Sequence, residues 1–141
     1  MEQRRGVMSV EYKVNQLISS DQFIELLMRS GLAERRPIDD LECMAGMVIN
    51  SNLLVTAWHG ERLVGVARSM TDFHYACYLS DLAVDKHFQR QGIGKALITE
   101  TQKQLEPQCK LILISAPDAN EYYPSLGFVN NPRCWVLEQP R

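Results

Sequence analysis

The spacing of hydrophobic and polar residues changes several times along this chain, and each change predicts a new structural element. Residues 10–17 alternate between apolar and polar side chains, as in a strand with one buried face. Further along, apolar positions recur three and four residues apart, which predicts a helix over residues 20–30. Ser19 and Gln22 form a capping-box pattern at its start, and Gly31 predicts its end.

A second helix and a hairpin are predicted after this first helix. Pro37, with the acidic residues that follow it, is typical of a helix start. Residues 52–70 contain two runs rich in valine, leucine and aromatic side chains, and these runs flank a turn at residues 59–61. This pattern predicts a β-hairpin, and residues 74–85 predict a third long strand directly after it.

The last third of the chain contains alternating helix and strand signals. Apolar positions after Gly94 predict a helix that ends before Pro107. Residues 110–115 form a short continuous apolar run, which is typical of a strand buried on both faces. A short helix is predicted over residues 118–127, and residues 128–139 are expected to supply one or two final strands.

The order of these elements predicts a mixed sheet with helices on its faces. Three successive strands favour antiparallel neighbours, whereas a strand–helix–strand unit favours a parallel pair. We therefore expect an α/β fold (α+β in some schemes) that forms a single domain over residues 1–141. Its sheet should be twisted and mostly antiparallel, with about six or seven strands and about four helices.

Composition and charge argue against several classes of partner. The formal net charge is −2 and 23% of the residues are charged, so no basic field favours nucleic acid or an anionic membrane. No apolar run approaches the ~20 residues of a membrane span. The N-terminal segment MEQRRGVMSVEYK lacks the apolar core of a secretory signal. These features predict a cytoplasmic protein that binds neither nucleic acid nor membrane.

The four cysteines contain no C-x-x-C pair, and the three histidines lie at no metal-ligand spacing from them. Free thiols in a reducing compartment are therefore expected. The sequence predicts no metal site.

The loop over residues 89–94, Gln-Arg-Gln-Gly-Ile-Gly, precedes a predicted helix and is a candidate binding site. Glycine is unfavourable inside a helix, so two glycines here suggest a ligand that approaches the backbone closely. A Walker A motif is excluded because Ala96 follows Lys95, and Leu97 stands where a Rossmann motif needs glycine or alanine. The remaining interpretations are a pyrophosphate cradle at the positive end of the helix dipole, and a helix start that packs closely.

Two motifs resemble those of the GNAT superfamily, the GCN5-related N-acetyltransferases. The family fingerprint is Q/R-x-x-G-x-G/A after a strand, and Gln89, Gly92 and Gly94 match it. Residues 82–89 are similar to the family's strand and loop before this fingerprint. Residues 121–128, EYYPSLGF, resemble a second signature in which an aromatic–tyrosine pair precedes Gly-Phe. The resemblance extends over nearly the whole chain and implies a GNAT-like fold.

The resemblance implies that acetyl-CoA is the co-substrate. Pantetheine would lie along one strand, the pyrophosphate would accept backbone N–H groups of the cradle, and the thioester would enter a slot where two strands splay apart. The residues implied in binding acetyl-CoA are Leu82, Ala83, Val84, Gln89, Arg90, Gln91, Gly92, Ile93, Gly94, Lys95, Ser115 and Asn120. Tyr123 matches the tyrosine that commonly protonates the departing thiolate, although core packing alone would also explain a tyrosine there.

The motifs do not specify a general base. Some family members carry a glutamate on the strand before the cradle, where this chain has Tyr78. Asp81 lies three residues further along and is the first candidate, provided that the strand bulges; a buried structural role is the alternative. Proton removal by a chain of water molecules is another alternative. Three further side chains are also candidates for the base: Glu42, Asp72 and His74.

The acceptor is expected to be the primary amine of a small molecule, in a pocket walled by the first two helices and residues 31–40. The acidic side chains of Asp39, Asp40 and Glu42 would attract a cationic amine or only cap a helix. Arg68 would instead bind a carboxylate. A protein or peptide acceptor and a catalytically silent acyl-CoA sensor stay as alternatives. A final strand carrying Trp135 and Val136 is a possible contact in a homodimer.

Overall fold

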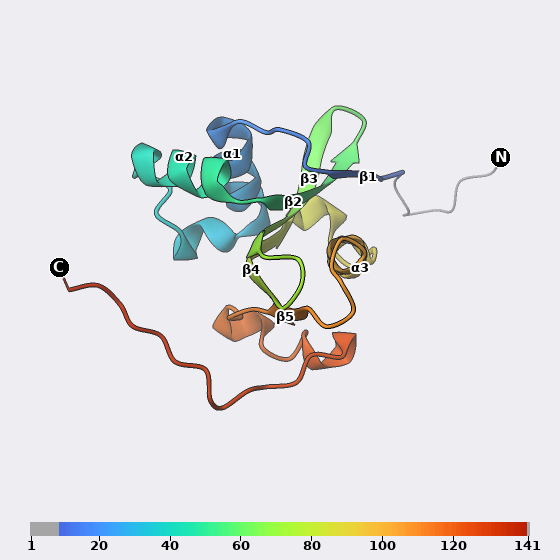
Figure 1. The fold of residues 1–141 in the computed structure, drawn as a ribbon. Helices are drawn as coiled ribbons and strands as arrows, with labels where there is room; N and C mark the ends of the chain where they lie inside the picture. Colours follow the sequence, from blue (N-terminus) through green and yellow to red (C-terminus); the bar gives the residue numbers. More distant parts are fainter. Residues whose placement is uncertain (1–8, 141) are drawn as a thin grey trace.

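A five-stranded sheet is the framework of the computed structural model, which describes residues 9–140 (Figure 1). Its strands lie side by side in chain order: β1 (Glu11–Val14), β2 (Leu53–His59), β3 (Arg62–Thr71), β4 (Ala76–Val84) and β5 (Lys110–Ile112). Neighbours from β1 to β4 are antiparallel, and β5 runs parallel to β4. The predicted hairpin, third long strand and mixed sheet are confirmed. The prediction that the N-terminal segment carries no secretory signal concerns mainly residues 1–8, which lie outside the described residues.

Helices cover both faces of this sheet (Figure 1). The α-helices are α1 (Ser20–Ser30), α2 (Leu41–Asn50) and α3 (Ile93–Gln102). One face forms a core with Ile93 and Leu97 of α3, and the other forms a core with Phe23 and Leu27 of α1. A Cβ on Gly65 of β3 would lie 3.1 Å from Leu97 Cδ1, so the missing side chain lets α3 approach the sheet closely.

The helix ends follow local hydrogen bonding. The predicted capping box of α1 is present: Gln22 N donates to Ser19 Oγ at 3.0 Å, and Gly31 ends the helix at φ 88°. The prediction that Pro37 opens the second helix is wrong. That helix begins four residues later, because the Asp40 carboxylate accepts a hydrogen bond from Cys43 N and caps it there.

A bulge in β4 changes which face its later side chains take. Leu79 and Asp81 pair with successive residues of β3, so Ser80 between them is an extra residue. Leu79 and Leu82 both pack in the α3 core although they are three positions apart. Asp81 therefore turns toward the face covered by α1 and α2.

The C-terminal part of the chain differs from the prediction. Among the described residues, no strand follows β5, so the sheet has five strands instead of six or seven. The short helix predicted over 118–127 is two 3-10 turns, η3 (Pro117–Ala119) and η4 (Pro124–Leu126). Pro124 explains the interruption, since it removes the backbone donor that a continuous helix would need.

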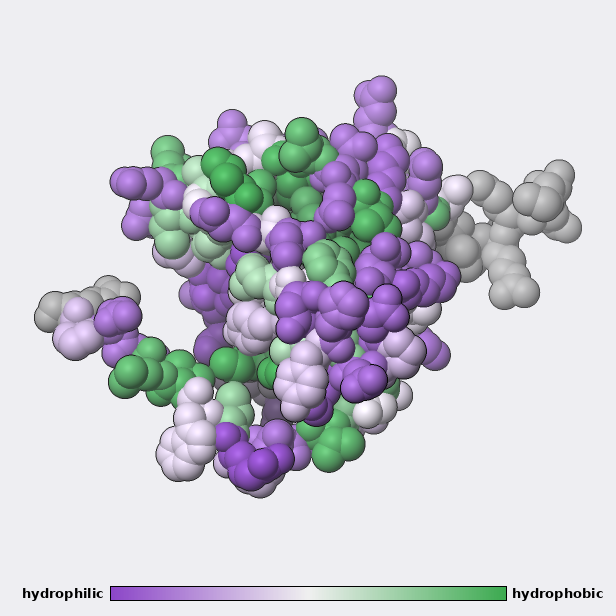
Figure 2. Space-filling view, viewed as in Figure 1, coloured by the Kyte–Doolittle hydropathy of each residue, from purple (hydrophilic) through white to green (hydrophobic). Residues whose placement is uncertain are grey.

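The missing strands also change the environment of β5. The prediction that this strand is buried on both faces is wrong, because β5 is an edge strand and Ile112 is 44% exposed. Residues 129–140 instead run as an extended segment away from the body of the molecule (Figure 1). Figure 2 shows hydrophobic side chains on this segment, where Trp135 and Leu137 are 89% and 95% exposed. None of the described helices combines the length and the apolar character that crossing a membrane requires.

Candidate active site

A cleft of about 1110 Å³ opens where β4 and β5 separate. The last paired residues of these strands are Tyr78 and Ile112, whereas β4 continues to Val84. The backbone of β4 beyond the bulge therefore has no strand partner on this side. Four groups of residues wall the cleft: the end of β4, the start of α3, the 3-10 turn η1 (Leu32–Arg35), and the turns η3 and η4. The splayed strands that the sequence predicts are present.

The start of α3 forms a glycine-rich cradle at one end of the cleft. Gly92 is the N-cap of the helix with φ 80°, and Arg90 also has a positive φ of 65°. A left-handed conformation at a non-glycine residue is uncommon and is often found at functional sites. The Gln89 side chain fixes this loop, because its Nε2 donates to the carbonyl of Val84 at 3.0 Å. The first N–H groups of a helix lack internal partners, so this arrangement can bind an anion.

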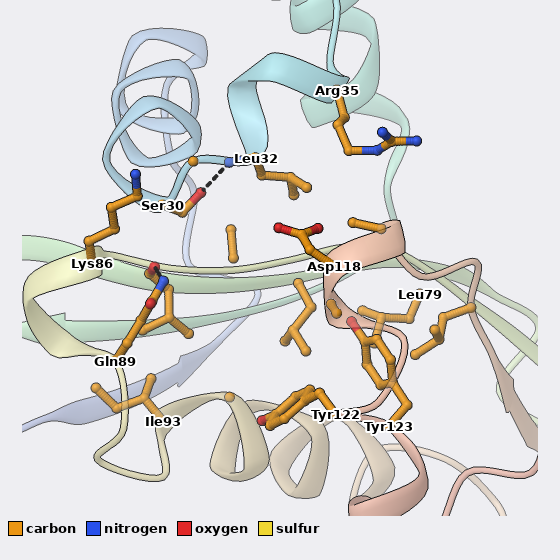
Figure 3. A pocket seen from close by; sticks show the side chains of 18 of the residues that line it. Ser30, Leu32, Arg35, Leu79, Lys86, Gln89, Ile93, Asp118, Tyr122 and Tyr123 are labelled. Carbon is orange, nitrogen blue, oxygen red and sulfur yellow. Dashed lines mark hydrogen bonds between the residues drawn. The ribbon is translucent and has the colours of Figure 1, made fainter.

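Positive side chains surround the cradle. Lys86, Arg90 and Lys95 all line the cleft. Figure 3 shows the Tyr122 ring beside α3, with its hydroxyl directed toward the start of that helix. A Cβ built on Gly94 would lie 2.6 Å from that hydroxyl oxygen. The missing side chain of Gly94 therefore leaves room for the Tyr122 hydroxyl.

Tyr123 also lines the cleft, just before η4. Its ring contacts the rings of Tyr122 and Phe128, with centroids 5.3 and 5.5 Å away in edge-to-face geometry. Burial raises the pKa of Tyr123 above the ordinary tyrosine value, the neighbouring Tyr122 raises it further, and the positive charge of Arg36 opposes both. The phenol is thus protonated at neutral pH and can donate a proton into the cleft.

Asp81 does not have the position that a general base requires. It is fully buried and does not line the cleft. Arg36 Nε donates to its Oδ1 and Arg68 Nε donates to its Oδ2, each at 2.5 Å. The predicted bulge is present, but it turns Asp81 between two guanidinium groups. The geometry gives Asp81 a positioning role and argues against the prediction that it is the base.

The other acidic and histidine candidates also lie away from the cleft. Glu42 is exposed on α2, and His74 is exposed in the loop between β3 and β4. Asp72 accepts backbone hydrogen bonds within that loop, including those of His74 and Tyr75, and these bonds hold the pKa of its carboxyl below the usual value. None of these three side chains lines the cleft.

Two carboxylates that sequence reasoning missed line the cleft, Glu34 and Asp118. Figure 3 shows the Asp118 carboxylate directed across the cleft toward η1, with the Tyr123 phenol on the same wall. Glu34 belongs to no motif, and the sequence marked Asp118 only as the start of a short helix. They line the same cleft only because η1 and η3, which are far apart in sequence, both wall it.

Most of the predicted acetyl-CoA residues meet in this one cleft. Those that line it are Leu82, Ala83, Val84, Gln89, Arg90, Gly92, Ile93, Gly94 and Lys95. Gln91 is not among the lining residues. Ser115 lines a smaller neighbouring pocket instead, and its hydroxyl donates to Asn120 Oδ1 at 3.0 Å. Asn120 lines neither cavity, so its implied contact with pantetheine has no support from the cleft geometry.

Arg68 is also placed differently from its predicted role in carboxylate binding. Its side chain is buried, and it donates to the Met47 carbonyl and to Ser80 Oγ in addition to Asp81. It lies over the Phe23 ring and lines neither cavity. Arg68 is therefore a structural residue.

Comparison with known proteins agrees with this architecture. Residues 32–133 match the family model of the acetyltransferase (GNAT) domain. Fold and match together define the class of this domain, an acetyltransferase (GNAT) domain. The chain belongs to the GNAT family of N-acetyltransferases.

Relatives by sequence include the uncharacterized N-acetyltransferase ycf52 of Gracilaria tenuistipitata var. liui, which is 28% identical over 101 residues. That match covers 70% of this chain and 56% of the relative. The histone acetyltransferase TAP1 of Glycine max is 34% identical over 74 residues, covering 51% of this chain and 32% of that protein. The chain spans about half the length, or less, of the curated relatives it matches.

Solved structures share the fold over nearly the full chain. A probable acetyltransferase from Staphylococcus aureus has a TM-score of 0.76 at 20% identity, covering 94% of this chain and 100% of its own. An aminoglycoside acetyltransferase from an uncultured soil metagenomic sample has a TM-score of 0.65 at 23% identity. That match covers 94% of this chain and 96% of the other.

Proposed function

We propose that this protein transfers the acetyl group of acetyl-CoA to the primary amine of a small molecule. One observation carries the proposal: the glycine cradle, the opened edge of β4 and the Tyr123 phenol all line the same cleft. Four cysteines without disulfide bonds support the further proposal that the protein works in the reducing cytoplasm.

The residues of the cleft fit the parts of acetyl-CoA. Backbone N–H groups at the start of α3, with Lys86, Arg90 and Lys95, would hold the phosphates. The unpaired edge of β4 over residues 82–84 would hydrogen-bond the pantetheine arm. When bound, the co-substrate supplies an acetyl group activated as a thioester. The chain itself orients that group and moves protons.

Tyr123 is the proposed general acid. As the amine nitrogen bonds to the acetyl carbon, the carbon–sulfur bond breaks and the phenol donates its proton to the leaving sulfur. The positive charge of Arg36 favours the phenolate that remains until solvent returns the proton. An N–H of the splayed β4 edge would polarise the thioester carbonyl.

Asp118 is the proposed acceptor of the amine proton, because its carboxylate points into the cleft from the wall that carries Tyr123 (Figure 3). Asp118→Asn should lower turnover most at low pH, where most of the amine is protonated, and the defect should shrink as pH rises. Glu42→Gln, at an exposed carboxylate of α2 that lines neither cavity, is the matched control. If the Asp118→Asn enzyme kept the wild-type pH profile, solvent and not Asp118 would be the acceptor of the amine proton.

Two other functions deserve a direct test. The match to a histone acetyltransferase favours a protein or peptide acceptor, and a silent acyl-CoA sensor would need no acceptor. A screen of small amines and lysine peptides with acetyl-CoA, followed by release of free CoA thiol, distinguishes all three functions. Turnover with a small amine supports the proposal. Tight acetyl-CoA binding by calorimetry without thiol release from any acceptor would establish the sensor instead.

A homodimer is also proposed, with the exposed segment around Trp135 as its contact. The exposed apolar side chains of this segment and the unpaired outer edge of β5 both favour contact between two copies. Light scattering of the wild type and of Trp135→Ser tests this: a monomer in both cases removes the dimer from the proposal.

A further inference from the structure

A second, smaller pocket of about 220 Å³ adjoins the cleft at the apex of the opening between β4 and β5. Its polar lining consists of two arginines and three hydroxyl-bearing residues: Arg35, Arg36, Tyr78, Ser80 and Ser115. The other lining residues are apolar, and no carboxylate lines the pocket within the described part of the chain. This composition provides hydrogen-bond donors and positive charge.

The guanidinium of Arg36 is fixed at the boundary between the two cavities and lines both. Its Nε donates to Asp81, its Nη2 donates to the Ser80 carbonyl at 3.0 Å, and its Nη1 donates to the Arg35 carbonyl at 2.8 Å. A guanidinium has five N–H donors, so these three bonds leave two for a ligand. The side chain keeps 21% of its surface exposed. Arg36 is therefore a preorganised donor.

The charges around this guanidinium do not cancel. The single negative charge of Asp81 is paired with two guanidinium groups, those of Arg36 and Arg68, so one positive charge is not neutralised. Arg35 adds another positive charge and forms no ion pair among residues 9–140. Figure 3 shows it directed away from the Lys86 end of the cleft, where the phosphates of acetyl-CoA are proposed to bind. The excess positive charge thus lies at the other end of the site.

We propose that the small pocket binds a carboxylate of the acceptor, so that the preferred acceptors are amines that also carry a carboxylate, such as amino acids and their derivatives. A planar carboxylate matches the forked geometry of a guanidinium and accepts two parallel hydrogen bonds from it. The hydroxyls of Tyr78 and Ser80 provide further donors. The amine would then lie in the adjoining cleft, where Glu34 and Asp118 supply the negative charge that an ammonium group favours. Asp81 acts here as a positioning residue for Arg36.

This inference rests on the proposed acetyltransferase activity, and matched acceptor pairs test it. The pairs are lysine and 1,5-diaminopentane, histidine and histamine, tyrosine and tyramine, each assayed by release of CoA thiol. We expect the carboxylated member to have a kcat/KM at least about tenfold higher, as one charge-assisted hydrogen-bonded contact provides. The difference should lie mainly in KM, because the carboxylate takes no part in the chemistry.

Two variants connect this preference to the pocket. Arg36→Gln should abolish it, and Arg35→Gln, at an exposed side chain without an ion pair in the described structure, should reduce it while the protein stays folded. Arg133→Gln, an exposed arginine outside both cavities, should leave it unchanged. Equal or better use of the decarboxylated amines by the wild type, or a preference that survives Arg35→Gln and Arg36→Gln, would overturn the inference. Thiol release from no amine of either kind would instead refute the proposed function.

Discussion

The hydroxyl oxygen of Tyr122 lies beside the start of α3, only 2.6 Å from the position that a Cβ on Gly94 would take. The contact joins the two motifs that are far apart in sequence, the glycine loop and the EYYPSLGF segment. It also separates the roles of the two adjacent tyrosines. Tyr122 borders the proposed phosphate cradle, whereas Tyr123 borders the proposed position of the thioester.

Gly94→Val should weaken acetyl-CoA binding at least about tenfold, on the order of 1.4 kcal/mol, because the added atoms occupy the cradle. Gly94 has no positive φ, so the protein should still fold, whereas Gly92→Val would add backbone strain at φ 80°. Calorimetry measures the affinity. The double variant Gly94→Val, Tyr122→Ala is the control: recovery of affinity there would mean that the displaced Tyr122 ring caused the loss, not the cradle.

Tyr123→Phe keeps the ring packed against Phe128 but removes the proton. We expect kcat to fall at least about tenfold, within the usual range for general acid catalysis, while the Kd of acetyl-CoA changes less than about threefold. Tyr122→Phe should leave kcat nearly unchanged. If Tyr122→Phe were the damaging change, the assignment of the acid would be wrong.

The pH dependence of turnover should also reflect the role of Tyr123 as the general acid. A general acid works while it is protonated, so activity is lost as pH rises through its pKa. Burial raises the pKa of Tyr123 above the ordinary tyrosine value of 10.0, with Tyr122 adding to the rise. The wild-type rate should therefore show almost no loss from this group up to about pH 9, one unit below that value. A pH–rate profile limited near pH 7 to 8 by an acid that Tyr123→Phe removes would contradict this expectation.

Asp81→Asn should act mainly on stability. Removing one partner of a buried ion pair typically costs about 3–5 kcal/mol, and Asp81 has two such partners in Arg36 and Arg68. Thermal unfolding should shift downward, by on the order of 10 °C for a chain of this size. The shape of the pH–rate profile should be retained below the new Tm. If the pH–rate profile of Asp81→Asn no longer fell at low pH, Asp81 would be the general base after all.

Asp85 should contribute a separate dependence of stability on pH. Burial alone would raise its pKa, but the backbone N–H of His87 and the guanidinium groups of Arg29 and Arg62 outweigh burial and lower it. A carboxyl whose folded pKa is depressed stabilises the fold above its unfolded pKa, and this contribution is lost as pH falls through the folded pKa. The wild type should therefore lose stability below about pH 4, the usual range of an aspartate.

Urea unfolding between pH 7 and pH 3 measures this effect. The gap in unfolding free energy between the wild type and Asp85→Asn should be largest at pH 7 and should narrow as the solution becomes more acidic. Glu100→Gln, which removes only an exposed ion pair with Lys103, serves as the matched variant. If the gap in unfolding free energy were constant across this pH range, the pKa of Asp85 would not be lowered in the folded protein.

The sequence by itself determined the first helix, the hairpin and the long strand after it, and it predicted an anion-binding loop. Ser19, Gln22 and Gly31 define the ends of α1 because capping depends only on neighbours in the chain. The spacing of Gln89, Gly92 and Gly94 indicated an anion site for the same reason, since its donors belong to one loop and one helix start. The EYYPSLGF motif led to the prediction that Tyr123 is the general acid.

Only the tertiary structure decided the partners of groups that are distant in sequence. Asp81 looked like a base because the motif spacing pointed near it, but Arg36, 45 residues away, occupies one of its oxygens. Glu34 and Asp118 reach the cleft through turns that face each other across it, which no local pattern encodes. Residues 128–139 have strand-like composition, but strand formation needs a hydrogen-bonding neighbour, and none of the described residues supplies one. Local sequence fixes the preferences of each segment, whereas charge pairing, burial and sheet membership depend on which segments meet.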